Sequence, residues 1–254
     1  IARKGYLPPL ELLVNDANYE RVELIRRNLN QLSEIGISWQ LRNDFAEAIL
    51  CKAFLERCFF NLIDLDCFGS PNSLIQPVLQ VLAFDGVLML SSTDGRSPTG
   101  HDRQGAIRSF AAAARTHPAS WEIALRLKLA VVARQSCLLG HGLEPLTCFS
   151  DGRTFRIYVR LKRKIHLGQE SFLGFLARCE SCGTQSTQSL LTLKGWPKCD
   201  CDQGSGLWAV TGPLWLGPLQ SPSEIVHLMR VADDFNIPIA NETRRLLERL
   251  NADP

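Results

Sequence analysis

The sequence lacks the features of a membrane or secreted protein. None of its apolar runs reaches the roughly 18 consecutive residues that a membrane-spanning helix needs. The first residues, Ile1-Ala2-Arg3-Lys4, include no apolar core before a small-residue cleavage site, which excludes a signal peptide. No Met stands at position 1, so we expect the chain to be a fragment whose natural start is missing. The expected location is the cytoplasm, with an organelle as the alternative.

The chain also has little net charge and no internal repeat. Its 28 basic and 26 acidic residues give a formal charge of +2, which is too small to indicate a polyanionic partner by itself. Binding to a nucleic acid must therefore be argued from local clusters of cations. Apolar residues make up 45% of the 254 residues, which is typical of a globular protein and excludes a disordered or fibrous chain.

Three short apolar stretches each end in acidic or polar residues. They cover residues 10–14, 60–63 and 87–90, and amphipathic or apolar helical patterns at 22–32 and 121–139 alternate with them. Buried strands that alternate with helices are typical of an α/β protein with a parallel sheet, which binds its ligand at the carboxyl ends of the strands. We therefore expect polar strand ends to form a binding site.

Two extended segments follow the long helix and predict an antiparallel hairpin. They cover residues 143–149 and 154–161, and Ser150-Asp151-Gly152 forms the turn between them. In the second segment, apolar and polar side chains alternate strictly. This hairpin is expected to close a mostly parallel sheet, so we place a domain boundary near Lys164. The predicted domains are 1–164, an α/β domain, and 165–254, a smaller α+β domain.

The stretch from Asp64 to Pro71 (DLDCFGSP) is the most informative for function. It places a carboxylate, Asp66, and an aromatic ring, Phe68, at the end of a buried strand. Phe68 would stack on a flat heterocycle while Asp66 accepts hydrogen bonds from its exocyclic amine. The alternative is a strand-end Asp that caps the next helix, followed by an ordinary turn.

This stretch resembles the Asp-Pro-Phe-Gly motif of the tRNA guanine-26 N2-dimethyltransferases, which use S-adenosylmethionine (SAM). Further matches follow the same order as in that family and cover nearly the whole chain. They are VNDAN at 14–18, VELIRRN at 22–28, Asp44, Thr93-Asp94, EIALR at 122–126, GLEPL at 142–146, FRIYVR at 155–160 and GPLWLG at 212–217.

The resemblance implies a Rossmann-like SAM methyltransferase sheet and a role for several residues. Asp16 would bind the SAM ribose hydroxyls, Asp44 with the backbone of Phe45 would hold the adenine edge, and Arg3 would match an arginine of the cofactor site. Asp66 and Phe68 would then be the catalytic residues, which present the amine of a guanine in tRNA to the activated methyl group. The implied products are N2-methyl- and N2,N2-dimethylguanosine.

Two departures from the family pattern matter. Cys67 replaces the Pro of the motif, so the turn after Asp66 loses a fixed φ angle. We interpret Cys67 as a small apolar filler, because methyl transfer to an amine needs no covalent enzyme intermediate. The family's first strand and its Gly-rich SAM loop have no counterpart in the sequence, so we expect this chain alone to bind SAM poorly.

Four cysteines near the carboxyl end predict a structural zinc site. Cys179 and Cys182 form a CxxC pair, and Cys199 and Cys201 form a tighter CxC pair. Two such pairs let four thiolates reach one tetrahedral zinc ion, and a closed shell of four sulfurs leaves no position for catalysis. Free thiols or a redox pair are the alternatives, and His166 is an outside candidate ligand.

The densest basic segment follows the turn of the predicted hairpin. Arg156, Arg160 and Lys162 would line one face of the second strand and form a track for RNA phosphates. The alternative is a solvated sheet face.

Two other functions remain open from the sequence. One is a non-catalytic RNA-binding paralogue, which is consistent with Cys67 and the absent Gly-rich loop. The other is a SAM enzyme that methylates an amine on a protein or a small molecule.

Overall fold

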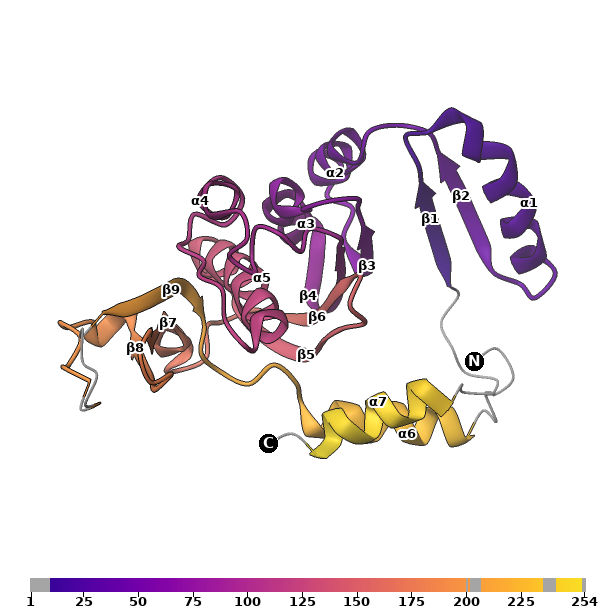
Figure 1. Cartoon of the computed structure of the whole chain (residues 1–254). Helices are drawn as coiled ribbons and strands as arrows, with labels where there is room; N and C mark the ends of the chain where they lie inside the picture. The colour runs from indigo at the N-terminus through magenta and orange to yellow at the C-terminus, as the bar shows by residue number, and fades with distance from the viewer. Residues whose placement is uncertain (1–9, 200, 202–206, 235–240, 253–254) are drawn as a thin grey trace.

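The strands of the chain form three sheets with helices around them (Figure 1). A computed structural model describes residues 10–199, 201, 207–234 and 241–252. The first sheet and its helix lie at one end of the molecule, the largest sheet in the middle and the third sheet at the other end. None of the helices in these ranges combines the length and apolar character needed to cross a bilayer.

The first sheet is a parallel pair. Strand β1 (Glu11–Asn15) lies beside β2 (Ser38–Arg42), and a short 3-10 turn, η1 (Tyr19–Arg21), and helix α1 (Val22–Ser33) connect them. This is the right kind of connection for parallel strands, because the chain must return along the sheet before it can pair in the same direction. The sequence prediction of a strand near 10–14 and a helix over 22–32 is confirmed.

The second sheet has four strands in the order β3-β4-β6-β5. Strand β3 (Phe60–Asp66) pairs parallel with β4 (Leu82–Ser92). The predicted hairpin is confirmed as β5 (Gly142–Ser150) and β6 (Phe155–Lys162), and β6 pairs antiparallel with both β4 and β5. The sheet is therefore mixed rather than mostly parallel, because the short turn between β5 and β6 forces the chain to reverse.

Helices cover this sheet and lead into its strands. Helix α2 (Ala46–Leu55) precedes β3, and a 3-10 turn, η2 (Asn72–Leu74), with α3 (Ile75–Val81) leads directly into β4. Beyond β4 come α4 (Arg103–Phe110) and the long α5 (Ser120–Leu138), which packs on β5 and β6. Because apolar residues occur around most of its circumference, α5 is buried against several elements at once.

The third sheet has the order β8-β7-β9 and is antiparallel. It contains β7 (Leu173–Cys179), β8 (Gln185–Ser189) and β9 (Trp208–Trp215), with 3-10 turns η3 (Gln169–Phe172) and η4 (Leu190–Thr192) beside them. Helices α6 (Pro222–Asp234) and α7 (Asn241–Ala252) follow and pack on each other.

Strand β9 joins the third sheet to the rest of the protein. It packs against α5, and Gly212 forms a bridge with Ala113 through N–H···O distances of 2.8 and 2.9 Å. The Arg126 guanidinium of α5 donates to the carbonyl oxygens of Trp215 and Gly217 at 3.0 and 2.8 Å. All three strands of this sheet come after residue 164, but the division into 1–164 and 165–254 stays a prediction.

A lysine is buried where α5 passes under the end of β4. Lys128 is 2% exposed, and its ammonium donates to Ser92 Oγ and to the Asp94 carbonyl oxygen, each at 2.8 Å. Its Nζ lies 5.2 and 4.9 Å from the ring centroids of Phe110 and Phe155, which provide favourable π faces. Burial lowers the pKa of Lys128 to about 8, and the charge of Asp94 opposes this shift.

This lysine predicts a pH dependence of stability. Its pKa of about 8 in the folded chain lies below the ordinary value of 10.5, so the unfolded chain holds more protons between these two pH values. The free energy of unfolding should therefore rise with pH in that window, by on the order of 1 kcal/mol per pH unit. Urea unfolding of the unaltered protein and of Lys128→Met should show this rise only in the unaltered protein.

An exposed lysine gives the control. Lys52 on α2 is 63% exposed and pairs with Glu56, so Lys52→Met should keep the pH dependence of the unaltered protein. Parallel stability curves for the unaltered protein and Lys128→Met across this window would contradict the assignment.

Candidate active site and metal centre

The carboxyl ends of β1 and β2 hold two carboxylates on one rim. Because the strands are parallel, Asp16 and Asp44 follow neighbouring strand ends. The Asn15 side chain donates to the Asp44 carbonyl oxygen at 2.9 Å and accepts from the Asp44 N–H at 3.1 Å. Asn43 donates in turn to the Asp16 carbonyl oxygen at 2.6 Å. The structure thus brings together these two residues, which the family resemblance assigns to the cofactor.

Each of these carboxylates is partly engaged by its own loop. Asp16 Oδ1 accepts from the Asn18 N–H at 2.8 Å, and Asp16 Oδ2 lies 3.7 Å from the Arg21 guanidinium. Asp44 Oδ1 accepts from the Phe45 N–H at 2.8 Å, so this backbone donor is already used within the chain. The Asp44 carboxylate is thereby oriented at the start of α2. Arg3, the remaining predicted cofactor residue, lies outside the described residues.

The loop after β3 is held by hydrogen bonds to the end of β4. The Gly69 carbonyl oxygen accepts from Ser92 Oγ at 2.8 Å and from the N–H groups of Thr93 and Asp94 at 3.0 and 3.2 Å. The Gly69 N–H donates to Thr93 Oγ1 at 2.7 Å. Gly69 has φ +76°, a left-handed conformation that glycine adopts without strain. The tight turn carries Asp66 and Phe68 at its start.

Asp66 and Phe68 are both presented to solvent. The Asp66 side chain is 68% exposed, and its Oδ1 lies 3.8 Å from the Arg156 guanidinium. Asp66 and Arg156 lie on strands that flank β4, and Ser91 of β4 is the register partner of each of them, which explains this ion pair. Phe68 is 86% exposed, so its ring face is free to stack on a ligand. Both residues lie at the carboxyl end of β3, where the sequence predicted them, and their role in binding a base stays a prediction.

Burial and nearby carboxylates both act on the Cys67 thiol of this loop. Burial raises the pKa of the Cys67 thiol, and the charges of Asp66 and Glu47 raise it further. Glu47 lies in the first turn of α2, directly after Asp44 and Phe45. The charge of Glu47 thus acts on the Cys67 thiol, whereas no hydrogen bond or ion pair joins Asp66 to Asp44 in the described chain. A raised pKa keeps Cys67 a neutral thiol, as the filler interpretation requires.

Asp64 and Tyr158 respond to the same charges. Burial raises the pKa of Asp64, the charge of Asp66 raises it further, and Arg156 lowers it. Burial likewise raises the pKa of the Tyr158 hydroxyl, which Arg156 opposes. Arg156 is thus a cation whose charge lowers the pKa of both Asp64 and Tyr158.

The four predicted metal ligands form one cluster. Their sulfur atoms all lie within 4.8 Å of one another, with Cys182 and Cys199 at 3.4 Å and Cys179 and Cys201 at 3.8 Å. Gly183, at φ +81°, closes the turn of the first pair, and its N–H donates to the Cys179 carbonyl oxygen at 3.0 Å. Hydrogen bonding with the side chain and backbone of Thr184 lowers the pKa of the Cys182 thiol to about 6.

The donor set fits a tetrahedral thiolate site. Zinc–sulfur bonds of about 2.3 Å in a tetrahedron place the sulfurs roughly 3.8 Å apart, close to the distances in this cluster. Cys179 is buried at the end of β7, whereas Cys182 is exposed. One side of the cluster therefore faces the sheet and the other faces solvent.

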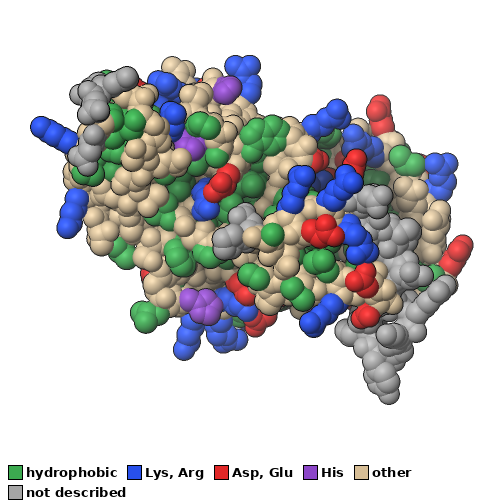
Figure 2. Space-filling view, turned by 60° about the horizontal axis from the view of Figure 1, so that its bottom comes forward, with side chains coloured by type: hydrophobic (Ala, Val, Ile, Leu, Met, Phe, Trp, Pro, Cys, Tyr) green, Lys and Arg blue, Asp and Glu red, His purple; other side chains and the backbone are tan. Residues whose placement is uncertain are grey.

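Basic side chains of the predicted RNA-binding strand form ion pairs with carboxylates of the same chain. Arg160 lies 3.3 Å from Glu144 and 3.0 Å from Glu224, while Lys162 lies 3.0 Å from Asp85 and 3.1 Å from Glu144. RNA phosphates would have to compete with these carboxylates. On the face shown in Figure 2, basic and acidic side chains are interspersed in the same way. Phosphate binding by Arg156, Arg160 and Lys162 stays a prediction.

Sequence reasoning missed the residues that hold the Asp66 loop in place. Ser92 donates to the Gly69 carbonyl oxygen and Lys128 donates to Ser92 Oγ. Neither residue belongs to a recognisable motif. One signal was present, because Lys128 interrupts an apolar stretch of the helix that the sequence predicts to be buried. A charged residue at such a position needs a partner, which marks it as a residue with a specific role.

Comparison with known proteins places this geometry in a family. The family model for N2,N2-dimethylguanosine tRNA methyltransferase matches residues 8–254. The tRNA (guanine(26)-N(2))-dimethyltransferase of Methanocorpusculum labreanum is 25% identical over 259 residues, which cover 100% of this chain and 64% of that protein. The protein of the same name from Thermococcus kodakarensis is 28% identical over 250 residues, covering 92% and 62%.

A solved structure agrees with the fold. Trm1 from Pyrococcus horikoshii, in complex with S-adenosyl-L-methionine, matches with a TM-score of 0.80 and 23% identity, over 95% of this chain and 65% of that one. The chain thus spans slightly less than two thirds of the length of its curated relatives. Since the family model covers nearly all of its residues, the chain belongs to the N2,N2-dimethylguanosine tRNA methyltransferase family.

Proposed function

We propose that the chain is the catalytic and carboxyl-terminal portion of a tRNA methyltransferase. It would transfer methyl groups from SAM to the exocyclic N2 of guanine 26, forming the mono- and then the dimethylated base. The carrying observation is the exposed Asp66–Phe68 pair at the end of β3, in a turn that hydrogen bonds to Gly69 hold against the end of β4. The relatives' names, which specify this reaction, support the same conclusion.

Asp16, Asp44 and Phe45 would hold SAM, together with Arg3. In support, the Asp16 and Asp44 carboxylates lie on one rim, as a ligand with a ribose diol and an adenine edge requires. Bound SAM would supply a methyl group activated by its positively charged sulfur. The Phe45 N–H is engaged by Asp44, so the adenine contact would fall on the Asp44 carboxylate and the exposed Phe45 ring.

Asp66 would position and then deprotonate the target amine. The lone pair of N2 is delocalised into the guanine ring, so reaction depends on holding the amine in line with the methyl donor. The Asp66 carboxylate would accept hydrogen bonds from the amine and receive the proton that the amine loses when the N–C bond forms and the bond between sulfur and the methyl group breaks. Arg156 lies 3.8 Å from the Asp66 carboxylate and is its ion-pair partner. Phe68 supplies the platform for a guanine flipped out of the tRNA stack.

We also propose a structural zinc ion at Cys179, Cys182, Cys199 and Cys201. The spacing of the sulfurs supports four-coordinate binding. The metal would fix the end of β7 against the segment that leads to β9. This site belongs to the proposed second domain, 165–254, as the proposed SAM-binding domain ends near residue 164.

Methylation should depend on guanine 26. The purified full-length protein should transfer radiolabelled methyl from SAM to an unmodified tRNA, and a tRNA with adenine at position 26 should accept almost none. Equal incorporation into both tRNAs would refute guanine-26 specificity. Incorporation into protein or a small amine but not tRNA would favour another SAM methyltransferase, and tRNA binding without incorporation would favour a non-catalytic RNA-binding protein.

Replacement of Asp66 by Asn should remove the proton acceptor and preserve the shape of the side chain. We expect kcat to fall by about 100-fold with little change in KM for tRNA, since general bases contribute on the order of 10²–10⁴. Steady-state methylation assays measure both constants. Asp234→Asn, an exposed change on α6, is the matched control. Near-normal kcat in Asp66→Asn would remove Asp66 from the mechanism.

The zinc proposal predicts about one zinc ion per chain by elemental analysis. Cys199→Ser should lower the zinc content and the unfolding temperature, whereas Cys51→Ser, at an exposed thiol outside the cluster, should change neither. Well under one equivalent in protein purified without chelators would count against the site.

A further inference from the structure

A hollow of about 400 Å³ opens near the Asp66 loop, at the same edge of the sheet. We call it the Trp121 hollow, and its walls include Thr93, Arg96, His101, Trp121, Arg153 and Phe155. Thr93 belongs both to this hollow and to the Asp66 loop, because its Oγ1 accepts from the Gly69 N–H at 2.7 Å. A ligand in the hollow would therefore be a neighbour of whatever Asp66 holds.

The hollow presents cations that have no partner within the described chain. Arg96 and Arg153 are exposed, and neither side chain forms an ion pair or hydrogen bond with another described residue. No Asp or Glu side chain lines the hollow. Arg160 and Lys162 differ in this respect, since carboxylates of the same chain already neutralise them. The Trp121 hollow thus has positive charge available for an anionic ligand.

Its aromatic wall is fixed in position. Trp121, at the start of α5, is 45% exposed, and its ring centroid lies 5.9 Å from that of Phe155. Gly152 passes close to the indole at φ +94°, where a Cβ atom would come within 2.8 Å of the ring. Only glycine fits this approach, so the turn and the indole hold each other. The exposed part of the indole is a rigid stacking surface.

Both arginines project from loops that are braced by hydrogen bonds. Asp151 Oδ1 accepts from the N–H groups of Arg153 and Thr154 at 2.9 and 2.7 Å. On the other loop, the Arg96 carbonyl oxygen accepts from the His101 N–H at 3.1 Å, and Asp94 Oδ1 accepts from the Ser97 N–H at 3.2 Å. The two guanidinium groups therefore extend from fixed backbone positions around the aromatic wall.

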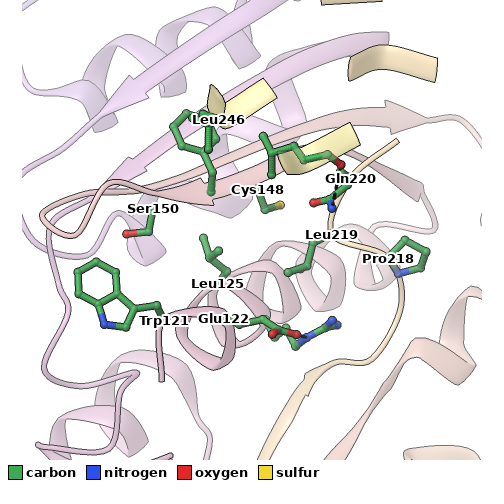
Figure 3. Close-up of a pocket in the computed structure, with 12 residues that line it drawn as sticks. Trp121, Glu122, Leu125, Cys148, Ser150, Pro218, Leu219, Gln220 and Leu246 are labelled. Atoms are coloured by element: carbon green, nitrogen blue, oxygen red, sulfur yellow. Dashed lines mark hydrogen bonds and ion pairs between the residues drawn. The ribbon is translucent and has the colours of Figure 1, made fainter. Parts of the chain in front are cut away.

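A second cavity lacks this character. It measures about 410 Å³ and lies between α5, β5, the segment 218–220 and α7 (Figure 3). Trp121 lines it as well, but its cation, Arg126, is bound by Glu122 at 2.8 Å and by two backbone carbonyl groups. Leucine side chains from α5 and α7 cover much of the remainder, including Leu125 and Leu246. An anionic ligand would find no free charge there.

We propose that the Trp121 hollow binds one nucleotide of the tRNA beside the target guanine. Its base stacks on the Trp121 indole, and its phosphate lies between Arg96 and Arg153. Unpaired nucleotides are typically recognised by a stacked aromatic ring together with cations on the backbone. A neighbour bound in this way would hold the strand open while the guanine occupies the Asp66 loop. This proposal rests on the proposed function, since it takes the ligand to be tRNA.

Equilibrium binding of an unmodified tRNA transcript to the full chain, measured by fluorescence anisotropy over a range of salt concentrations, tests the hollow. Arg96→Ala and Arg153→Ala should each weaken binding and lower the slope of log K against log salt by about 1. Trp121→Ala should raise Kd by about tenfold or more, and Trp121→Phe should restore most of the affinity. Arg27→Ala removes an exposed arginine of α1 and is the matched control.

The outcomes separate this proposal from the proposed function. Arginine variants with the Kd and salt slope of Arg27→Ala would overturn the hollow as a tRNA site, while methylation of guanine 26 by the same preparation would leave the proposed function intact. Equal losses in Trp121→Phe and Trp121→Ala would overturn the stacking role. Failure of the unaltered chain to bind tRNA would overturn both proposals.

Discussion

The carbonyl group of Gly69 is the point on which the candidate site depends. It accepts from the Ser92 hydroxyl and from two consecutive backbone N–H groups, and Lys128 donates to Ser92 from the core. Three donors on one carbonyl oxygen fix the turn between β3 and η2 against the end of β4. Without this contact, the exposed side chains of Asp66 and Phe68 would have no defined position, because few other contacts of their own hold them.

The buried ammonium makes this contact costly as well as specific. A charged group in the core loses its hydration, which is why the pKa of Lys128 falls to about 8. Two hydrogen bonds and two aromatic faces compensate for part of that loss. An apolar side chain would fill the same space at a lower cost in desolvation free energy, but it would leave the Asp94 carbonyl oxygen without this donor. The fold thus gives up some stability in order to define the loop at the strand ends.

Much of the fold and part of the site followed from the sequence. The ends of β1, β3 and β4 were predicted because apolar runs stop at acidic or polar residues, and the cysteine cluster was predicted because the spacing within each pair is local. Other features depend on residues far apart in the chain. The pairing of Arg160 with Glu224 and the support of Gly69 by Lys128 arise only when distant segments meet. The parallel character of the sheet was overestimated for the same reason, since β6 inserts between β4 and β5.

Strand β9 connects the cysteine cluster to helix α5. At one end its Trp208 is the register partner of Cys179, and at the other its Trp215 carbonyl is bound by Arg126 of α5. The backbone of an extended strand is close to its maximum length, so a displacement at one end of β9 also displaces the other end. The four thiols and the helix that carries Lys128 are therefore joined through β9, so disorder at the sulfur cluster would weaken the support that Lys128 and Ser92 give to the Asp66 loop.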